Sequence, residues 1–171
     1  MFPAKGPIKP WSEDDLVRRV LPALAEGLGA LHGRGLVHRS LRPETIFAPD
    51  DAGSRVVIGE CASAPAGRSQ PLVYEPIERA MAQPSGRGEG TPEDDMFALG
   101  VTLVALLAGR HLLASVDDDT VIARRLSVGS FEAIAGLCNA TPAMRELLAG
   151  LLTDVPKYRW TIERLKGWLA G

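Results

Sequence analysis

The sequence predicts a mainly helical α+β domain with short β-hairpin structure. Long segments with apolar residues at helical spacing predict the helices, and two β-prone runs on either side of a turn predict the hairpin. The 171 residues are enough for one domain with its own core and too few for two. With 46% hydrophobic and 23% charged residues, the composition is that of an ordinary globular protein.

The first helix is predicted to begin after Ser12 and to run to about Gly33. Ser12 is a suitable N-cap, and the three acidic residues that follow it favour the positive end of a helix dipole. Leucine and valine then recur every three or four residues, which predicts one buried face. These apolar positions are Leu16, Val20, Leu24, Leu28 and Leu31.

Residues 45–48 and 55–58 are β-prone, and the intervening residues 49–54 are rich in Pro, Asp and Gly, which predicts a hairpin. Residues 61–71 and 83–90 are rich in small and turn-forming residues, which predicts loops.

Further helices are predicted after Thr91, Thr141 and Thr161. Thr91 and Thr141 are each followed by proline, and threonine as a cap with proline at the first helical position marks a helix start. Residues 96–109 carry no charge but are too few to span a membrane, so we expect a buried core helix there.

The composition argues against several classes of protein. Nineteen basic and 21 acidic residues give a net charge of −2, which disfavours nucleic-acid binding. Residues 1–10 hold three prolines and no apolar run, so they do not resemble a secretory signal. Cys61 and Cys138 are far apart; we predict reduced thiols in a cytoplasmic protein without a membrane span, and a disulfide is the open alternative.

Residues 31–47, LHGRGLVHRSLRPETIF, resemble the end of the long helix and the catalytic loop of protein kinases, whose pattern is H-R-D-L-K-P-E-N. Four further stretches follow in the family's order. Residues 56–61 stand where the Asp-Phe-Gly motif belongs, 74–78 resemble a loosened Ala-Pro-Glu segment, 95–101 resemble the start of the buried central helix, and 154–161 resemble D-P-x-x-R-x-T. The ordered set is far more specific than any member, and it covers roughly residues 12–168.

The resemblance implies the C-terminal lobe of a bacterial-type Ser/Thr protein kinase fold. Residues 12–171 would form this helical lobe, and residues 1–11 an arm that remains from a hinge or linker. The family's N-terminal lobe is expected to be absent from the chain.

The resemblance also implies roles for five structural residues. Glu78 and Arg159 would form a buried ion pair, and Asp95 would accept hydrogen bonds from His38 and from the backbone near Arg39. We interpret His38 itself as a core histidine with satisfied hydrogen bonds rather than a catalytic group.

The residues that kinase chemistry needs are replaced. Ser40 stands at the catalytic base, Thr45 at the metal-binding asparagine, and Gly59 at the Asp-Phe-Gly aspartate, while Arg42 replaces a lysine. A serine hydroxyl is not a base near neutral pH, and Mg²⁺ prefers carboxylate oxygens. We therefore predict a pseudokinase with no catalytic residues, no metal site and no Mg-ATP binding.

On this interpretation the chain is a non-catalytic protein-interaction or regulatory module. The alternative is residual or altered phosphotransferase or nucleotide-binding activity, with an N-terminal lobe supplied elsewhere and Glu44 or Glu60 recruited to the metal. A small-molecule phosphotransferase and an unrelated helical protein are further alternatives.

The expected partner is a protein, either a second copy in a homodimer or the remainder of a longer chain. We expect it to bind the surface that the N-terminal lobe covers in complete kinases. The alternative is that the N-terminal arm folds down and covers this surface by itself. The residues proposed for the surface are Phe2, Ile8 and Trp11 in the arm, Ile46, Phe47, Val57 and Ile58 in the hairpin, and Arg39, Arg42 and Arg55 at its rim.

Overall fold

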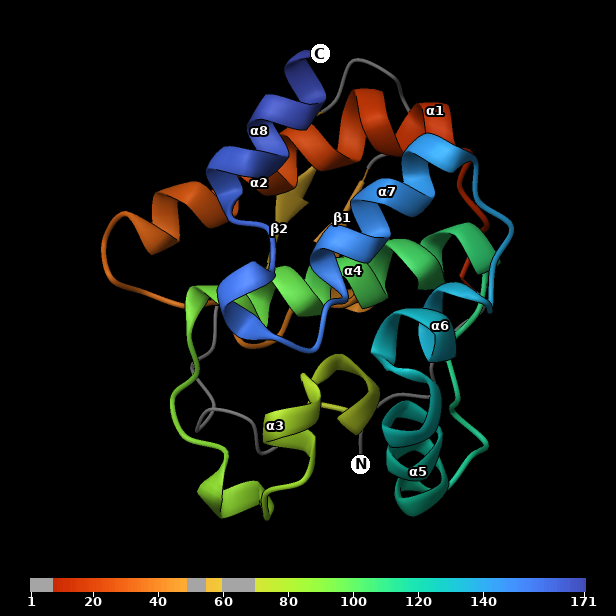
Figure 1. The fold of residues 1–171 in the computed structure, drawn as a ribbon. Helices are drawn as coiled ribbons and strands as arrows, with labels where there is room; N and C mark the ends of the chain where they lie inside the picture. The colour runs from red at the N-terminus through yellow and green to blue at the C-terminus, as the bar shows by residue number, and fades with distance from the viewer. Residues whose placement is uncertain (1–7, 49–54, 60–69) are drawn as a thin grey trace.

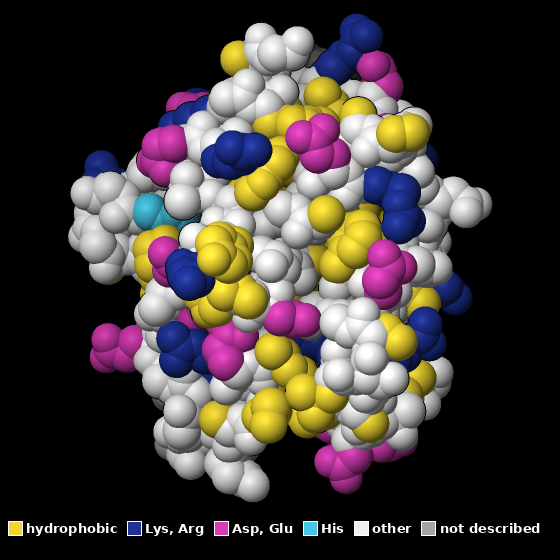
Figure 2. Space-filling view, in the orientation of Figure 1, with side chains coloured by type: hydrophobic (Ala, Val, Ile, Leu, Met, Phe, Trp, Pro, Cys, Tyr) yellow, Lys and Arg dark blue, Asp and Glu magenta, His cyan; other side chains and the backbone are white. Residues whose placement is uncertain are grey.

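The computed structural model describes residues 8–48, 55–59 and 70–171. Helix α4 (Pro92–Ala108) crosses the middle of the fold, with α2, α7 and α8 on one side and α3 and α5 on the other (Figure 1). On the face seen in Figure 2, basic and acidic side chains lie intermingled with small apolar patches, in keeping with the nearly balanced charge. The predicted mainly helical fold with a small two-stranded sheet is confirmed.

The first predicted helix is present but contains a wide turn. It consists of α1 (Glu13–Asp15), the π-helical segment η1 (Leu16–Val20) and α2 (Leu21–His32). Ser12 Oγ accepts the backbone N–H of Asp15 at 3.1 Å, as the capping pattern predicts. Pro22 has no N–H and crowds the carbonyl four residues before it, so a helix that continues through it widens just upstream.

The hairpin strands are shorter than predicted. They are β1 (Ile46–Phe47) and β2 (Val57–Ile58), which pair antiparallel with Phe47 opposite Val57. The turn predicted at residues 49–54 lies outside the described residues. The 3₁₀ turn η2 (Pro43–Thr45) leads into β1. It ends residues 38–45, which resemble the catalytic loop of kinases and are called the catalytic-loop segment below.

After its acidic first turn, α4 runs through the core, as the lack of charge in residues 96–109 predicts. Met96 to Ala105 are buried, and Thr102 satisfies its hydroxyl by donating to the carbonyl of Ala98 at 2.7 Å. A Cβ on Gly100 would lie 2.8 Å from Leu152 Cδ2 and 3.0 Å from Leu151 Cβ. The glycine therefore lets α7 approach α4 closely.

The structure confirms the two threonine caps of the C-terminal half. Thr141 caps α7 (Pro142–Leu151) and Thr161 caps α8 (Ile162–Ala170), each accepting a backbone N–H at 3.3 Å. Other elements were not predicted individually. They are η3 (Leu72–Tyr74), α3 (Ile77–Ala80), η4 (Pro84–Gly86), α5 (Asp118–Val128), α6 (Ser130–Ala135) and η5 (Pro156–Tyr158). Among the described residues, no helix combines the length and apolarity needed to cross a membrane.

The described part of the N-terminal arm packs onto the lobe. Ile8 and Trp11 are half-buried against the core, and the backbone N–H of Trp11 donates to the carbonyl of Leu106 at 3.0 Å. The Arg19 guanidinium lies 5.7 Å from the centre of the Trp11 ring. These two arm residues are therefore not an open apolar surface, whereas Phe47 and Val57 are 55% and 48% exposed. Phe2 lies outside the described residues.

Replacing Gly100 by alanine tests the close approach of α4 and α7. Alanine has the better helix propensity, but its Cβ would press against Leu151 and Leu152. We expect Gly100→Ala to lower the free energy of unfolding by about 1–3 kcal/mol, the usual cost of overpacking. Urea denaturation measures this change.

The matched control is Gly167→Ala in α8, where an added Cβ meets no atom within 4 Å. This variant should be neutral or stabilised by up to about 1 kcal/mol, because only helix propensity changes. Equal stability changes in the two variants would contradict the packing argument.

Candidate functional site

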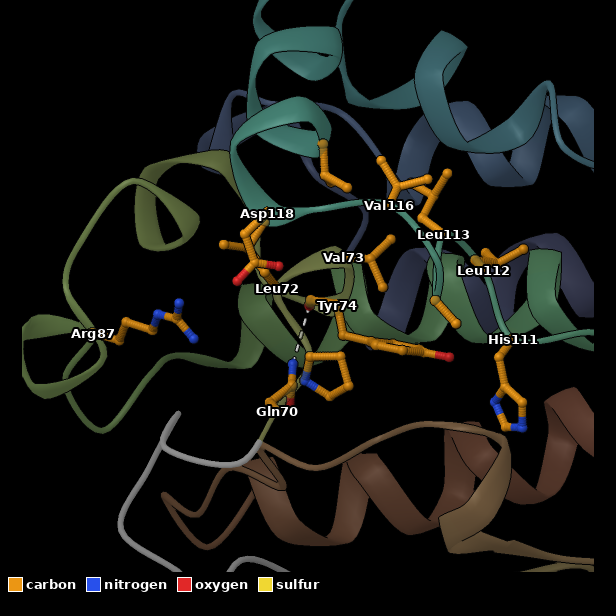
Figure 3. A pocket seen from close by; sticks show the side chains of 13 residues that line it. Gln70, Leu72, Val73, Tyr74, Arg87, His111, Leu112, Leu113, Val116 and Asp118 are labelled. Carbon is orange, nitrogen blue, oxygen red and sulfur yellow. Dashed lines mark hydrogen bonds between the residues drawn. The ribbon is translucent and has the colours of Figure 1, made fainter. Parts of the chain in front are cut away.

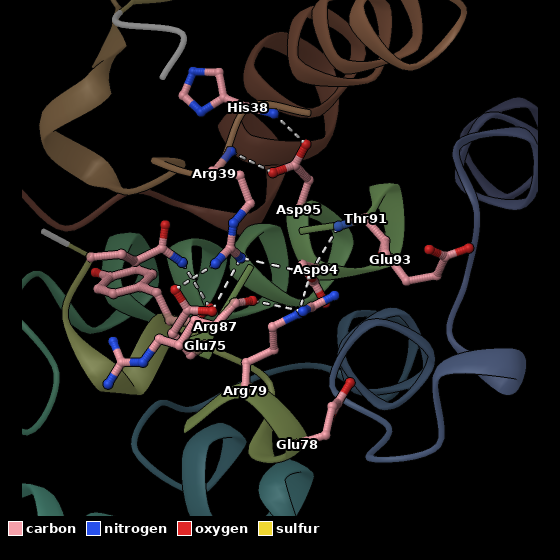
Figure 4. Close-up of polar contacts among 12 residues, drawn as sticks. His38, Arg39, Glu75, Glu78, Arg79, Arg87, Thr91, Glu93, Asp94 and Asp95 are labelled. Carbon is pink, nitrogen blue, oxygen red and sulfur yellow. Dashed lines mark hydrogen bonds and ion pairs between the residues drawn. The ribbon is translucent and has the colours of Figure 1, made fainter. Parts of the chain in front are cut away.

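Asp95, at the start of α4, holds the catalytic-loop segment by its backbone. The fully buried carboxylate accepts the N–H of His38 at 2.7 Å and that of Arg39 at 2.8 Å (Figure 4). This contact was expected from the resemblance. A third partner was not predicted: His32, at the end of α2, lies with Nε2 2.9 Å from Asp95 Oδ2.

The side chain of His38 turns away from Asp95. Its Nε2 lies 3.0 Å from the carbonyl of Gly59, and its Nδ1 accepts the N–H of Ser40 at 3.3 Å. The proton of the neutral ring is therefore on Nε2, which donates to Gly59. Burial lowers the pKa of His38, so the neutral form is favoured. These contacts fit a core histidine.

Glu78 and Arg159 are in contact, as expected, but the pair is not wholly buried. Arg159 Nη2 lies 3.5 Å from Glu78 Oε1; the arginine side chain is fully buried, while that of Glu78 is 38% exposed. Arg159 also donates to the carbonyls of Thr153 and Glu93. Burial lowers the pKa of Arg159, and Glu78 opposes that shift.

The buried ion pair of this region joins Arg39 to Glu75 instead. The two side chains are 1% and 0% exposed, and two parallel N–H···O contacts of 3.1 Å connect them. Asp94 lies 3.7 Å from Arg39 and also accepts from Arg79 at 2.8 Å (Figure 4). The prediction that Arg39 rims an exposed surface is therefore wrong, because its guanidinium turns inward to this carboxylate.

A third buried arginine reaches the same segment. Arg125, in α5, donates from Nη1 to the backbone carbonyl of Glu75 at 2.8 Å and from Nε to Ser130 Oγ at 2.9 Å. Burial lowers the pKa of Arg125 to about 10. Three guanidiniums, of Arg39, Arg125 and Arg159, thus converge on residues 75–78.

Glu75 was not predicted as a site residue, although the sequence around it indicates a buried charge. It is the single charge in residues 71–77, an otherwise apolar stretch. Burial raises the pKa of its carboxyl, and the Arg39 guanidinium opposes that shift. A lone carboxylate in such a stretch indicates a buried partner, but the sequence does not say which arginine supplies it.

Two of the replaced kinase positions have structural contacts of their own. The buried Thr45 hydroxyl lies 3.0 Å from the carbonyls of both Ser40 and Arg42 and accepts the Arg42 N–H at 3.2 Å. The Gly59 N–H donates to the carbonyl of Thr45 at 2.8 Å, and the Phe47 ring overlaps the place of a Cβ on Gly59. Ser40 is half-buried.

The remaining candidates do not converge on one site. Arg42 Nε lies 3.8 Å from Glu44, whose other oxygen lies 3.2 Å from His111 Nδ1. Arg55 pairs with Glu26 at 2.8 Å on the exposed surface of α2. Glu60, the second carboxylate considered for a metal, lies outside the described residues.

A cavity of about 360 Å³ lies beside η3 and was not predicted. Residues 70–74 form one wall and residues 111–118 after α4 form another (Figure 3). Gln70 donates to the carbonyl of Tyr74 at 3.1 Å, while its Oε1 is buried without a hydrogen-bond partner among the described residues. Burial raises the pKa of Tyr74, so its phenol stays protonated.

The Arg39–Glu75 pair is open to a stability test. Glu75→Gln removes the negative charge and leaves a buried guanidinium, so we expect a loss of about 3–5 kcal/mol in the free energy of unfolding. The double variant Arg39→Met with Glu75→Leu should recover much of that loss, because neither member of the pair is left as a buried charge without the other, and Asp94 keeps its contact with Arg79. Urea denaturation of the three proteins measures both effects.

Glu26→Gln is the matched control, since it breaks the exposed pair with Arg55. We expect a change of less than about 1 kcal/mol there. A Glu75→Gln protein that is as stable as Glu26→Gln would show that the buried pair does not hold this segment.

The comparisons with known proteins agree with this geometry. No family model matches the chain. The chain is 30% identical to serine/threonine-protein kinase SBK2 of Rattus norvegicus, over 90% of this chain and 46% of that protein. It is 30% identical to a CBL-interacting protein kinase of Oryza sativa subsp. japonica, over 86% of this chain and 40% of that protein. It is 26% identical to serine/threonine-protein kinase PknL of Mycobacterium tuberculosis, over 91% of this chain and 39% of that protein.

The chain spans less than half the length of these three relatives. The likeness covers most of the chain, and the motif segments follow one another in the family's order. The same motif segments belong to the helical fold that is built around α4. Together these findings identify the chain as a protein-kinase-like C-terminal lobe.

Proposed function

We propose that this lobe is a non-catalytic, pseudokinase-type module that acts as a protein-interaction or regulatory domain. The observation that carries the proposal is the set of residues at three catalytic positions, Ser40, Thr45 and Gly59. Phosphoryl transfer in kinases uses a carboxylate to accept the substrate proton and an aspartate and an asparagine to hold Mg²⁺. None of the three residues present offers a carboxylate.

The contacts of these residues support the proposal. The Thr45 hydroxyl is buried within its own loop, bonded to backbone groups of Ser40 and Arg42. A side chain on Gly59 would first have to displace the Phe47 ring. Glu44, one of the two carboxylates considered as a substitute ligand, lies against His111 and Arg42. We therefore expect neither kinase activity nor tight Mg-ATP binding.

The interaction surface that we propose is smaller than the one expected from the sequence. It is the hairpin patch, which consists of Phe47 and Val57, cross-strand neighbours on one side of the β1–β2 pair. A strand pair of two residues each adds little stability of its own. Phe47 and Val57 are adjacent and about half exposed, so a partner that covers them would remove apolar surface from water. The proposed occupant is a segment of another protein or of a longer form of this chain.

The activity test is transfer of radiolabelled phosphate from ATP to a general protein substrate in the presence of Mg²⁺. We expect none from the natural chain, because a general base alone contributes a factor of about 10²–10⁴ and the metal ligands add to it. Ser40→Asp with Gly59→Asp should also be inactive. Robust transfer by the unmodified protein, lost on a conservative change at Glu44, would instead establish the phosphotransferase alternative.

The interface test replaces Phe47 and Val57 by glutamate and measures association by light scattering at high protein concentration and by pull-down. We expect each substitution to weaken the association that the unmodified lobe shows, either with a second copy in light scattering or with another protein in the pull-down. Tyr158→Glu is the control, because Tyr158 is 67% exposed in η5, outside the hairpin. If all three variants behave like the natural chain, the hairpin patch is not the interface.

A further inference from the structure

The cavity of about 360 Å³ beside η3 is lined by a buried polar atom that lacks a hydrogen bond. Gln70 is only 6% exposed, and its Oε1 has no partner among the described residues. A buried acceptor without a donor is rare in native proteins, because the group has lost its water and gained nothing in return. The Oε1 atom therefore marks a place where the folded protein would gain from a donor that a ligand supplies.

The other contact of the Gln70 amide fixes which of its ends is open. The two ends of a glutamine amide have nearly the same shape, but the carbonyl of Tyr74 can only accept, so the Nε2 end must face it. This contact measures 3.1 Å and is drawn in Figure 3. Tyr74 is itself held in η3, where its N–H donates to the carbonyl of Pro71 at 2.9 Å. The end that remains for a ligand is Oε1, which can only accept.

Much of the remaining lining is aliphatic and comes from two segments that face each other. One wall belongs to η3, and the other belongs to the residues after α4 and to α5 (Figure 3). The volume is near the lower end of the range for small-molecule sites, so the occupant has to be compact. The aliphatic lining residues are Leu72, Val73, Leu112, Leu113, Val116 and Val121.

The charges around the cavity favour a neutral occupant. Arg87 and Asp118, of opposite sign, lie toward one end of it, and His111 lies at the other (Figure 3). His111 Nδ1 is 3.2 Å from a Glu44 oxygen, and Arg87 Nε donates to the carbonyl of Ala82 at 3.4 Å. An anion would be repelled by Asp118 and a cation by Arg87, so neither sign of charge is selected.

We propose that this cavity binds a small neutral molecule with an N–H donor and a branched aliphatic body, of the class of the primary carboxamides. The N–H donates to Gln70 Oε1, and the aliphatic body contacts the side chains of Leu72 and Val121. The lining contains neither the replaced kinase positions nor the residues of the hairpin patch, so the site does not depend on the proposed function.

The test is an NMR titration of the full chain with 3-methylbutanamide and, as the matched probe, with 4-methylpentan-2-one. The ketone has nearly the same shape and carries a methyl group in place of the amide NH₂. We expect both probes to shift the backbone amides of Val73 and Leu113 with saturation. The ketone should bind about three- to tenfold more weakly, which is the contribution of one hydrogen bond.

Gln70→Met removes the acceptor and keeps the length of the side chain, so the two probes should bind this variant equally. Gln83→Met, at an exposed position outside the lining, is the control and should keep the preference for the amide. Val116→Phe narrows the cavity from a half-buried wall and should abolish binding of both probes, which tests the site even where Gln70→Met does not fold.

The site would be overturned by shifts without saturation, or by equal affinities of the natural chain for the amide and the ketone. A preference for the amide that survives in Gln70→Met would overturn the role of Oε1. Unchanged binding of the amide by Val116→Phe would show that the probe lies outside this cavity.

Discussion

The buried carboxylate of Asp95 is the contact on which the rest of the site depends. Its partners come from the end of α2 and from the catalytic-loop segment, while Asp95 itself belongs to the central helix α4. A fully buried carboxylate requires its hydrogen bonds, because the penalty for leaving it unsatisfied is several kcal/mol. This requirement sets where the loop lies against α4, and thereby where His38 and Arg39 are placed.

Three buried arginines tie residues 75–78 to the lobe. Arg39 comes from the catalytic-loop segment, Arg125 from α5 and Arg159 from the turn before α8. Burial strongly disfavours each charge unless it meets a partner, so each arginine specifies one position of the segment. The arrangement explains how a stretch with little regular structure of its own can have a defined path.

The residues at the replaced kinase positions also make contacts within the lobe. Thr45 closes the loop through backbone bonds, and Gly59 accepts from His38 through its carbonyl while its missing side chain leaves room for Phe47. These residues stabilise the shape of the loop. That is the structural basis on which we propose a module that keeps the architecture of a kinase lobe without its chemistry.

The sequence by itself determined the helices with clear caps and the buried central helix, because caps and periodicity are local patterns with known geometry. The contacts of Asp95 with the backbone of His38 and Arg39, and of Glu78 with Arg159, were implied by the resemblance of the ordered motifs to protein kinases. The sequence did not determine the partner of Arg39, the role of His32 or the cavity beside η3. Glu75 is 36 residues from Arg39, and His32 is 63 residues from Asp95. Only the tertiary structure decides such pairings. A buried charge pairs with an oppositely charged or polar group that the packing of the helices and loops brings within contact distance, and the local sequence around the charge does not indicate which group that is.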